Sequence, residues 1–193
     1  MNRSFLLALA CVAAACGQSA DKTPPTAATA VPSHASSRAG GAAVKEDTLS
    51  PDVRRQLAAL RAATGRFHRY DAALEAGYDF RFMDMCMVDE SPERLGGMGY
   101  HQVDTLLLDG KVDVATPEAL MYEPQPNGQL RLVGVEYVIP AAAWTGPGKP
   151  TLFGREFREN QFGLWALHVW IWEDNPSGMF KDWNPRVTCD FAR

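Results

Sequence analysis

Residues 125–139 read QPNGQLRLVGVEYVI, and this stretch decides the fold class. It opens with Gln125 to Gly128, whose Asn-Gly pair is a strong signal for a turn between two strands. The run from Leu130 to Ile139 is rich in β-branched and aliphatic residues, as strands are. A second short run, Pro117 to Tyr122, precedes the turn. We therefore expect the two runs to pair as an antiparallel hairpin.

A third strand is expected further along the chain. Residues 162–172 read FGLWALHVWIW and are apolar on both alternations, which predicts burial on both faces.

An amphipathic helix is expected before the strands. Ser50 can cap it and Pro51 suits its first turn. Gly77 is a natural end for the helix, whereas Gly65 interrupts it, so two helices meeting near Gly65 are an alternative. Apolar residues recur along this region at helical spacing: Val53, Leu57, Leu60, Phe67, Leu74 and Tyr78.

These elements predict an α+β domain over residues 48–193. In it an N-terminal helix, or two, packs on a curved antiparallel sheet or half-barrel. The length of 193 residues, with 46% hydrophobic and 22% charged residues, suits one domain rather than two. The 23 acidic and 19 basic residues give a net charge of −4, which gives no electrostatic reason to expect a nucleic-acid partner.

The N-terminus has the pattern of an export signal. Residues 1–15 contain one basic residue and a short apolar run, too short for the roughly 30 Å of a bilayer core. Small residues precede Cys16 and resemble a bacterial lipobox, in which the cysteine is lipidated; ordinary cleavage nearby is the alternative. Residues 16–47 are rich in Ala, Ser, Thr, Pro and Gly and are expected to form a disordered tether. We expect a periplasmic or outer-membrane-anchored lipoprotein that contacts the membrane only through this lipid.

Six motifs of the domain resemble a family of uncharacterised exported bacterial proteins. The resemblance covers about residues 60–189 and implies a shared secreted fold and a shared pocket, without naming a reaction. The motifs are GMGYH (97–101), PEALMYEP (117–124), LRLVGVEY (130–137), HVWIW (168–172), NPSGMF (175–180) and WNP (183–185).

The cysteines predict one disulfide. Of four, Cys11 lies in the signal sequence and Cys16 is lipidated or removed, which leaves Cys86 and Cys189 in an oxidising compartment. A metal site at this pair would need further thiolates, which the mature chain lacks, so we expect Cys86 and Cys189 to be bonded.

Polar residues within apolar strands mark a candidate site. Glu136 and His168 occupy such positions, and a buried imidazole or carboxylate needs a partner. If they meet, and if His101 joins them, the three residues form a candidate site for a divalent metal such as zinc, iron or copper. The equally weighted alternative is a buried Glu136–His168 pair with His101 ordering a loop.

A pocket beside this group is expected to take a small apolar ligand. Its predicted lining residues are Tyr100, Glu118, Tyr122, Trp170 and Trp172. Met83, Met85 and Met87 alternate and would share one face of an extended segment, where their thioethers could bind Cu(I), although filling an irregular core is the commoner role of methionine.

Motifs for a hydrolase, a kinase or a dehydrogenase are not found in the sequence. The residues therefore favour an exported binding protein for a divalent metal or a small apolar ligand. A metal-dependent enzyme using the same pocket and a structural envelope protein are the alternatives.

Overall fold

The computed structural model describes residues 49–193. The expected signal peptide, the tether and Cys16 lie outside the described residues. Within the described range, no helix combines the length and the apolar character that crossing a membrane requires.

The helical region has two α-helices joined by a 3₁₀ turn. Helix α1 spans Pro51–Thr64, the 3₁₀ turn Gly65–His68 follows, and α2 spans Tyr70–Glu75. The side chain of Ser50 caps α1 by accepting a hydrogen bond of 3.3 Å from the Val53 amide. The two-helix alternative is therefore the one that forms, with the break at Gly65 as its sequence indicates.

Seven antiparallel strands form the main sheet of the described residues, in the order β1-β3-β4-β5-β9-β8 with β2 also paired to β3. A separate pair, β6 and β7, lies outside this sheet. The strands are β1 (Phe80–Arg81), β2 (Met87–Val88), β3 (Gly97–Val103), β4 (Ala119–Pro124), β5 (Leu130–Pro140), β6 (Thr151–Leu152), β7 (Arg155–Glu156), β8 (Arg158–Glu159) and β9 (Leu164–Val169). The α+β class and the antiparallel sheet are confirmed.

The expected hairpin is formed by β4 and β5, with the Gln125 amide bonded to the Gln129 carbonyl across the turn. The expected strand over 162–172 is shorter than predicted, because β9 ends at Val169. Beyond it the chain turns away from the strand direction: the Trp170 amide bonds to Met179, and the Trp172 amide bonds to Val133. These long-range hydrogen bonds end the strand although its sequence remains apolar.

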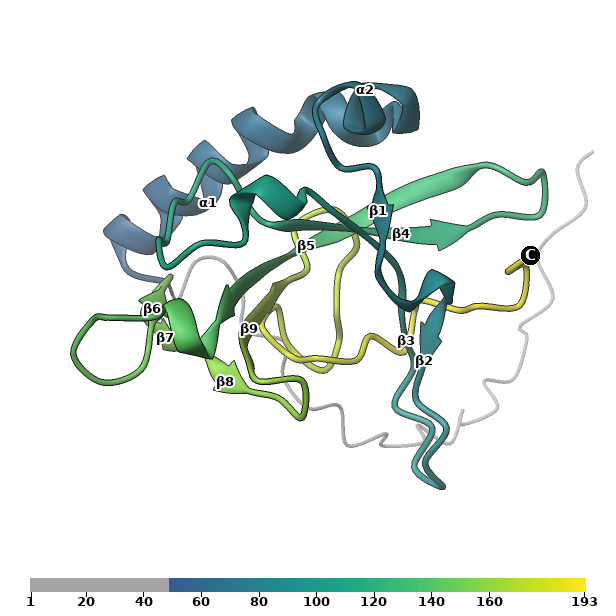
Figure 1. Cartoon of the computed structure of the whole chain (residues 1–193). Helices are drawn as coiled ribbons and strands as arrows, with labels where there is room; N and C mark the ends of the chain where they lie inside the picture. Colours follow the sequence, from purple (N-terminus) through teal and green to yellow (C-terminus); the bar gives the residue numbers. More distant parts are fainter. Residues whose placement is uncertain (1–48) are drawn as a thin grey trace, which may run out of the picture. The chain divides into compact units, whose positions relative to one another are not determined.

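The two faces of the sheet are covered differently. Helices α1 and α2 lie over one face (Figure 1). The chain after β9 packs on both faces, with Trp172 against the helix-covered core and Trp170 in the cluster opposite. The helix-covered face carries the larger core, which includes Leu57, Leu60, Tyr122, Tyr137 and Val169. The opposite face carries a smaller cluster around Met121, Val133 and Trp170. Part of this opposite face borders a cavity, described below.

Cys86 and Cys189 form the expected disulfide. It joins the segment between β1 and β2 to the C-terminal segment, across 103 residues of sequence. The C-terminal segment is thereby tied to the edge of the sheet on which β2 pairs with β3.

The sheet is curved enough for segments next to its two edges to touch. Phe82 follows β1 at one edge and Phe162 precedes β9 beside the other; their rings meet edge to face with centroids 5.4 Å apart. Phe82 belongs to a 3₁₀ turn, Phe82–Asp84, in which Met83 has a φ of 55°. The segment of Met83, Met85 and Met87 is therefore not one extended strand, and the shared methionine face does not form.

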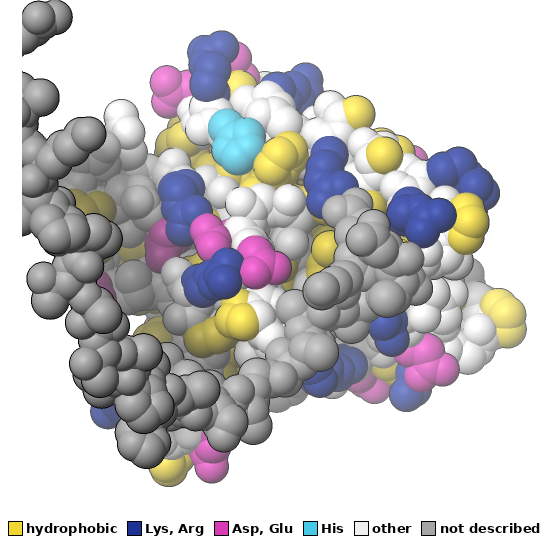
Figure 2. All heavy atoms as spheres, turned by 180° about the vertical axis from the view of Figure 1, so that it is seen from behind, with side chains coloured by type: hydrophobic (Ala, Val, Ile, Leu, Met, Phe, Trp, Pro, Cys, Tyr) yellow, Lys and Arg dark blue, Asp and Glu magenta, His cyan; other side chains and the backbone are white. Residues whose placement is uncertain are grey.

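The surface seen from behind in Figure 2 mixes basic, acidic and isolated hydrophobic side chains. Neither charge forms a continuous area over the described part of this face. On this face, basic and acidic side chains are thus interspersed.

Candidate metal site

Three strands bring His101, Glu136 and His168 together. His101 lies on β3, Glu136 on β5 and His168 on β9, and Glu136 and His168 are directly opposed in the β5–β9 register. Strand β4 lies between β3 and β5, where Ala119 pairs with Glu136. His101 pairs with Met121 on β4, so its imidazole reaches the Glu136 carboxylate across one intervening strand.

The ligand atoms of the three residues converge. His101 Nε2 lies 3.5 Å from Glu136 Oε2, and His168 Nε2 lies 3.5 Å from Glu136 Oε1. One ligand atom from each residue can be chosen so that all lie within 4.8 Å of one another. The two imidazole rings are nearly perpendicular, with their centroids 5.9 Å apart. The expected trio of ligands is therefore brought to one place.

Burial makes this arrangement costly for the polar atoms in it. The side chains of His101, His168 and Glu136 are 3%, 7% and 12% exposed. Within residues 49–193, both ring nitrogens of His168 and Nδ1 of His101 are buried without a hydrogen-bond partner. An unsatisfied buried polar atom costs about 1–3 kcal/mol, so each one calls for an explanation such as a bound ion.

The two histidines differ in their protonation. Burial lowers the pKa of His101 to about 4, against the opposing charge of Glu136. Burial also acts to lower the pKa of His168, but the charges of Glu136 and Asp182 outweigh it, and the pKa is raised. Near neutral pH His101 is therefore a neutral imidazole, the form that binds metal, whereas the raised pKa of His168 means that a proton competes with a metal ion for this imidazole.

Asp182 lies behind His168, on the side away from Glu136. Its Oδ1 is 3.5 Å from His168 Nδ1, and its Oδ2 accepts a 2.9 Å hydrogen bond from Arg158. The contact with His168 lowers the pKa of Asp182. A carboxylate on the second nitrogen of an imidazole orients the first nitrogen toward a metal and raises its basicity.

The three residues fit a divalent ion. Zinc binds imidazole nitrogen and carboxylate oxygen at about 2.0–2.2 Å, which places tetrahedral ligand atoms about 3.3–3.6 Å apart. The two separations of 3.5 Å lie within this range, but they involve different oxygens of Glu136. With one ligand atom from each residue the set spans up to 4.8 Å, so the side chains would have to draw together around an ion. Two imidazoles and one carboxylate would leave at least one coordination position for another molecule.

A cavity of about 600 Å³ adjoins the group. His101, Glu136 and His168 all line it, together with mainly apolar side chains from β1, β3, β5 and β9. Such a volume is in the range of small-molecule sites. The predicted combination of a polar group with an apolar pocket is present, but its walls differ from those predicted.

The five predicted pocket residues do not line this cavity. Tyr122 points into the helix-covered core, where its hydroxyl donates to the Phe67 carbonyl at 2.7 Å. Trp170 packs in the smaller cluster and donates to the Lys181 carbonyl. Trp172 donates to the Thr64 hydroxyl. All three serve packing, which is the commoner role of aromatic residues in strands.

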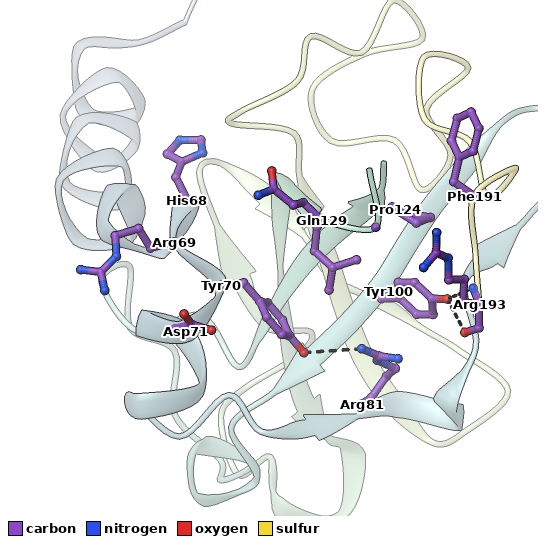
Figure 3. Close-up of a pocket in the computed structure, with 12 residues that line it drawn as sticks. His68, Arg69, Tyr70, Asp71, Arg81, Tyr100, Pro124, Gln129, Phe191 and Arg193 are labelled. Carbon is purple, nitrogen blue, oxygen red and sulfur yellow. Dashed lines mark hydrogen bonds between the residues drawn. The ribbon is translucent and has the colours of Figure 1, made fainter. Parts of the chain in front are cut away.

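Glu118 and Tyr100 lie elsewhere as well. Glu118 directly precedes β4, and its carboxylate accepts a 2.9 Å hydrogen bond from the Val138 amide of β5. Tyr100 neighbours His101 in sequence and therefore faces the other side of β3. There it lines a second cavity of about 590 Å³, together with Tyr70 and Arg81 (Figure 3). The alternation of β3 thus separates Tyr100 from the metal candidate.

Several residues of the site carry no sequence signal that singles them out. Asp182 lies in a loop and reaches His168 only through tertiary folding. Phe82 and Phe162 flank strands that are distant in sequence. Phe162 begins the apolar run over 162–172, which is the one local signal that could have drawn attention to it.

No protein-family model, curated protein or solved structure matches this chain. The functional argument therefore rests on the geometry of the site.

Proposed function

We propose that this protein is exported and binds one divalent metal ion through His101, Glu136 and His168, with an open coordination position toward the cavity. The observation that carries the proposal is the convergence of three buried ligand atoms, one of which, His168 Nε2, has no hydrogen-bond partner in residues 49–193.

A purely structural role explains this geometry less well. A buried carboxylate that serves only to satisfy two imidazoles is expected to hold them in hydrogen bonds of about 2.7–2.9 Å. Here both separations are 3.5 Å, and neither nitrogen of His168 has a hydrogen-bond partner in the described domain, although Nδ1 lies 3.5 Å from Asp182 Oδ1. A metal ion between the three side chains would satisfy the atoms that face it.

Zinc is the first candidate ion, because two imidazoles and one carboxylate with an open position are a common zinc set. Iron(II) uses the same ligand types, and copper binds imidazole strongly. The set lacks a thiolate, since Cys86 and Cys189 are bonded to each other. A nitrogen and oxygen set of this kind excludes a tetrathiolate centre at this place.

The test is the metal content and zinc affinity of the protein made from the full chain. Wild type is expected to bind one zinc per chain, and His168→Ala and Glu136→Gln are expected to lose at least tenfold in affinity. The matched control is His68→Ala, because His68 is an exposed histidine that meets Trp172 edge to face and does not line the cavity beside the site. Equal zinc affinity in wild type and His168→Ala would overturn the proposal.

A metal-dependent enzyme is the second candidate. It is favoured by the open coordination position, which catalytic zinc sites keep and structural ones fill. An exchangeable water on the bound metal would support this candidate, and a metal fully enclosed by protein ligands would oppose it.

Export and anchoring are supported by the apolar segment within residues 1–15, by the small residues before Cys16, and by the presence of a disulfide. Wild type is expected in the membrane fraction, and Cys16→Ser is expected to be released from it with its fold intact. A wild-type protein that is entirely soluble in the periplasm would exclude the lipid anchor and leave export in place.

A further inference from the structure

The cavity beside the metal candidate has apolar walls on most sides. They come from both edges of the sheet and from its central strands: Phe80, Phe82, Val103, Leu108, Phe162 and Leu164. The polar side chains other than His101, Glu136 and His168 are largely confined to residues 158–161 and Asp182. A ligand in this cavity would therefore contact mainly hydrocarbon and aromatic surface.

The rim of the cavity exposes aromatic side chains to water. Phe80 is 49% exposed and Phe162 is 45% exposed. Phe162 contacts Phe82 across the gap between the two sheet edges. Exposed aromatic residues that are gathered at a cavity, rather than scattered singly, mark a binding surface for an apolar partner.

The polar end of the cavity would be positively charged in the metal-bound form. A divalent ion brings two positive charges, and Glu136 is the one carboxylate among its three proposed ligands. The set therefore keeps one net positive charge and an open position, which an anionic oxygen would fill. Two further carboxylates line the cavity: Asp182, which pairs with Arg158 at 2.9 Å, and Glu159, which is exposed, so that solvent screens its charge.

We propose that the cavity takes a small amphiphilic acid, whose carboxylate binds the metal held by His101, Glu136 and His168 and whose apolar body lies against Phe80, Phe82 and Phe162. This inference rests on the proposed metal function. The carboxylate would meet the buried polar group, and the apolar body would meet the partly exposed aromatic side chains of the same cavity.

Calorimetry with decanoate tests the inference, at concentrations below those at which decanoate forms micelles. Decanoate is expected to bind the zinc-loaded protein at least tenfold more tightly than the zinc-free protein. Acetate, which has the carboxylate alone, and decanol, which has the chain alone, are each expected to bind the zinc-loaded protein at least tenfold more weakly than decanoate.

A matched pair of variants tests the apolar half. Phe162→Ser is expected to weaken decanoate binding at least fivefold without changing zinc affinity. Phe191→Ser is the control, because Phe191 is also 45% exposed but lines the cavity of Figure 3. It is expected to leave both affinities unchanged.

The outcomes separate the two proposals. If zinc binds but decanoate binds no better than acetate or decanol, or binds the zinc-free protein equally well, the ligand inference fails and the metal site stands. If Phe162→Ser binds decanoate as wild type does, the chain does not lie at this rim and the inference also fails. If zinc does not bind, both proposals fall.

Discussion

Glu136 is the residue around which the site is arranged, because each of its carboxylate oxygens faces one histidine. Its own position is set by β5, where its neighbours Val135 and Tyr137 point into the helix-covered core. The alternation of the strand then directs Glu136 to the opposite face. The packing of two apolar residues thus holds a charged one where solvent scarcely reaches it.

Asp182 is expected to position His168 without binding the metal. Asp182→Asn should weaken zinc binding about tenfold or more, since loss of such a carboxylate typically costs 10–100-fold in metal affinity. Zinc titration measures the effect. Asp174→Asn is the matched control, because Asp174 also pairs with an arginine at 2.9 Å, here Arg186. Equal losses in the two variants would show that Asp182 has no special role.

Glu118 is expected to make stability depend on pH. Burial raises its pKa to about 8, against the lowering effect of the Val138 amide. The unfolded carboxyl titrates near 4.5, so the folded state binds the extra proton between these two values. The stability from this group is complete below about pH 4.5 and is lost as pH rises through 8.

Glu118→Gln should remove that loss, because an amide keeps the acceptor for the Val138 amide and does not ionise. Between pH 5 and 8, the free energy of unfolding of wild type should fall relative to the variant by on the order of 3 kcal/mol. Chemical denaturation at several pH values measures both. Parallel curves for the two proteins would mean that Glu118 titrates normally.

At the scale of elements, the site depends on three strands that are distant in sequence but adjacent or nearly so in the sheet. Strands β5 and β9 pair directly, and β3 is separated from β5 by β4. On β4, Met121 pairs with His101 and Ala119 pairs with Glu136. The antiparallel register therefore brings the three candidate ligands together, whereas a local metal-binding motif brings its ligands together through their spacing in the sequence.

The disulfide is expected to stabilise the fold substantially. Cys86 and Cys189 are 103 residues apart, and closing a loop of that length is worth about 4–5 kcal/mol on the chain-entropy model. Reduction should therefore lower the melting temperature markedly. The Cys86→Ala/Cys189→Ala double variant is expected to have a melting temperature close to that of the reduced wild type. Adding reductant should not change the melting temperature of this variant. A wild type that melts equally with and without reductant would contradict this expectation.

Local sequence patterns predict some helices and strands correctly and miss the ends of others. The β4–β5 hairpin follows from the Asn-Gly turn and the aliphatic run after it, and the break between α1 and α2 follows from Gly65. The end of β9 does not follow, because it is set by hydrogen bonds from Trp170 and Trp172 to distant residues. The 3₁₀ turn at Met83 likewise interrupts a run whose alternation indicates an extended segment.

On the scale of the whole molecule, part of the site could be predicted from the sequence and part could not. Glu136 and His168 could be predicted because a polar residue in an apolar strand needs a partner. The pocket walls could not, because which aromatics face the cavity depends on strand alternation and on the curvature that brings Phe82 to Phe162. The sheet as a whole keeps one face for the helical core and part of the other for the cavity.

X-ray absorption at the zinc edge tests the central claim most directly, because it reports the atoms around the bound ion. For zinc-loaded wild type the account predicts scattering from two imidazoles and further nitrogen or oxygen ligands at about 2.0–2.2 Å. His101→Ala should lose one imidazole. Sulfur scattering at about 2.3 Å, or a spectrum unchanged by His101→Ala, would contradict the account.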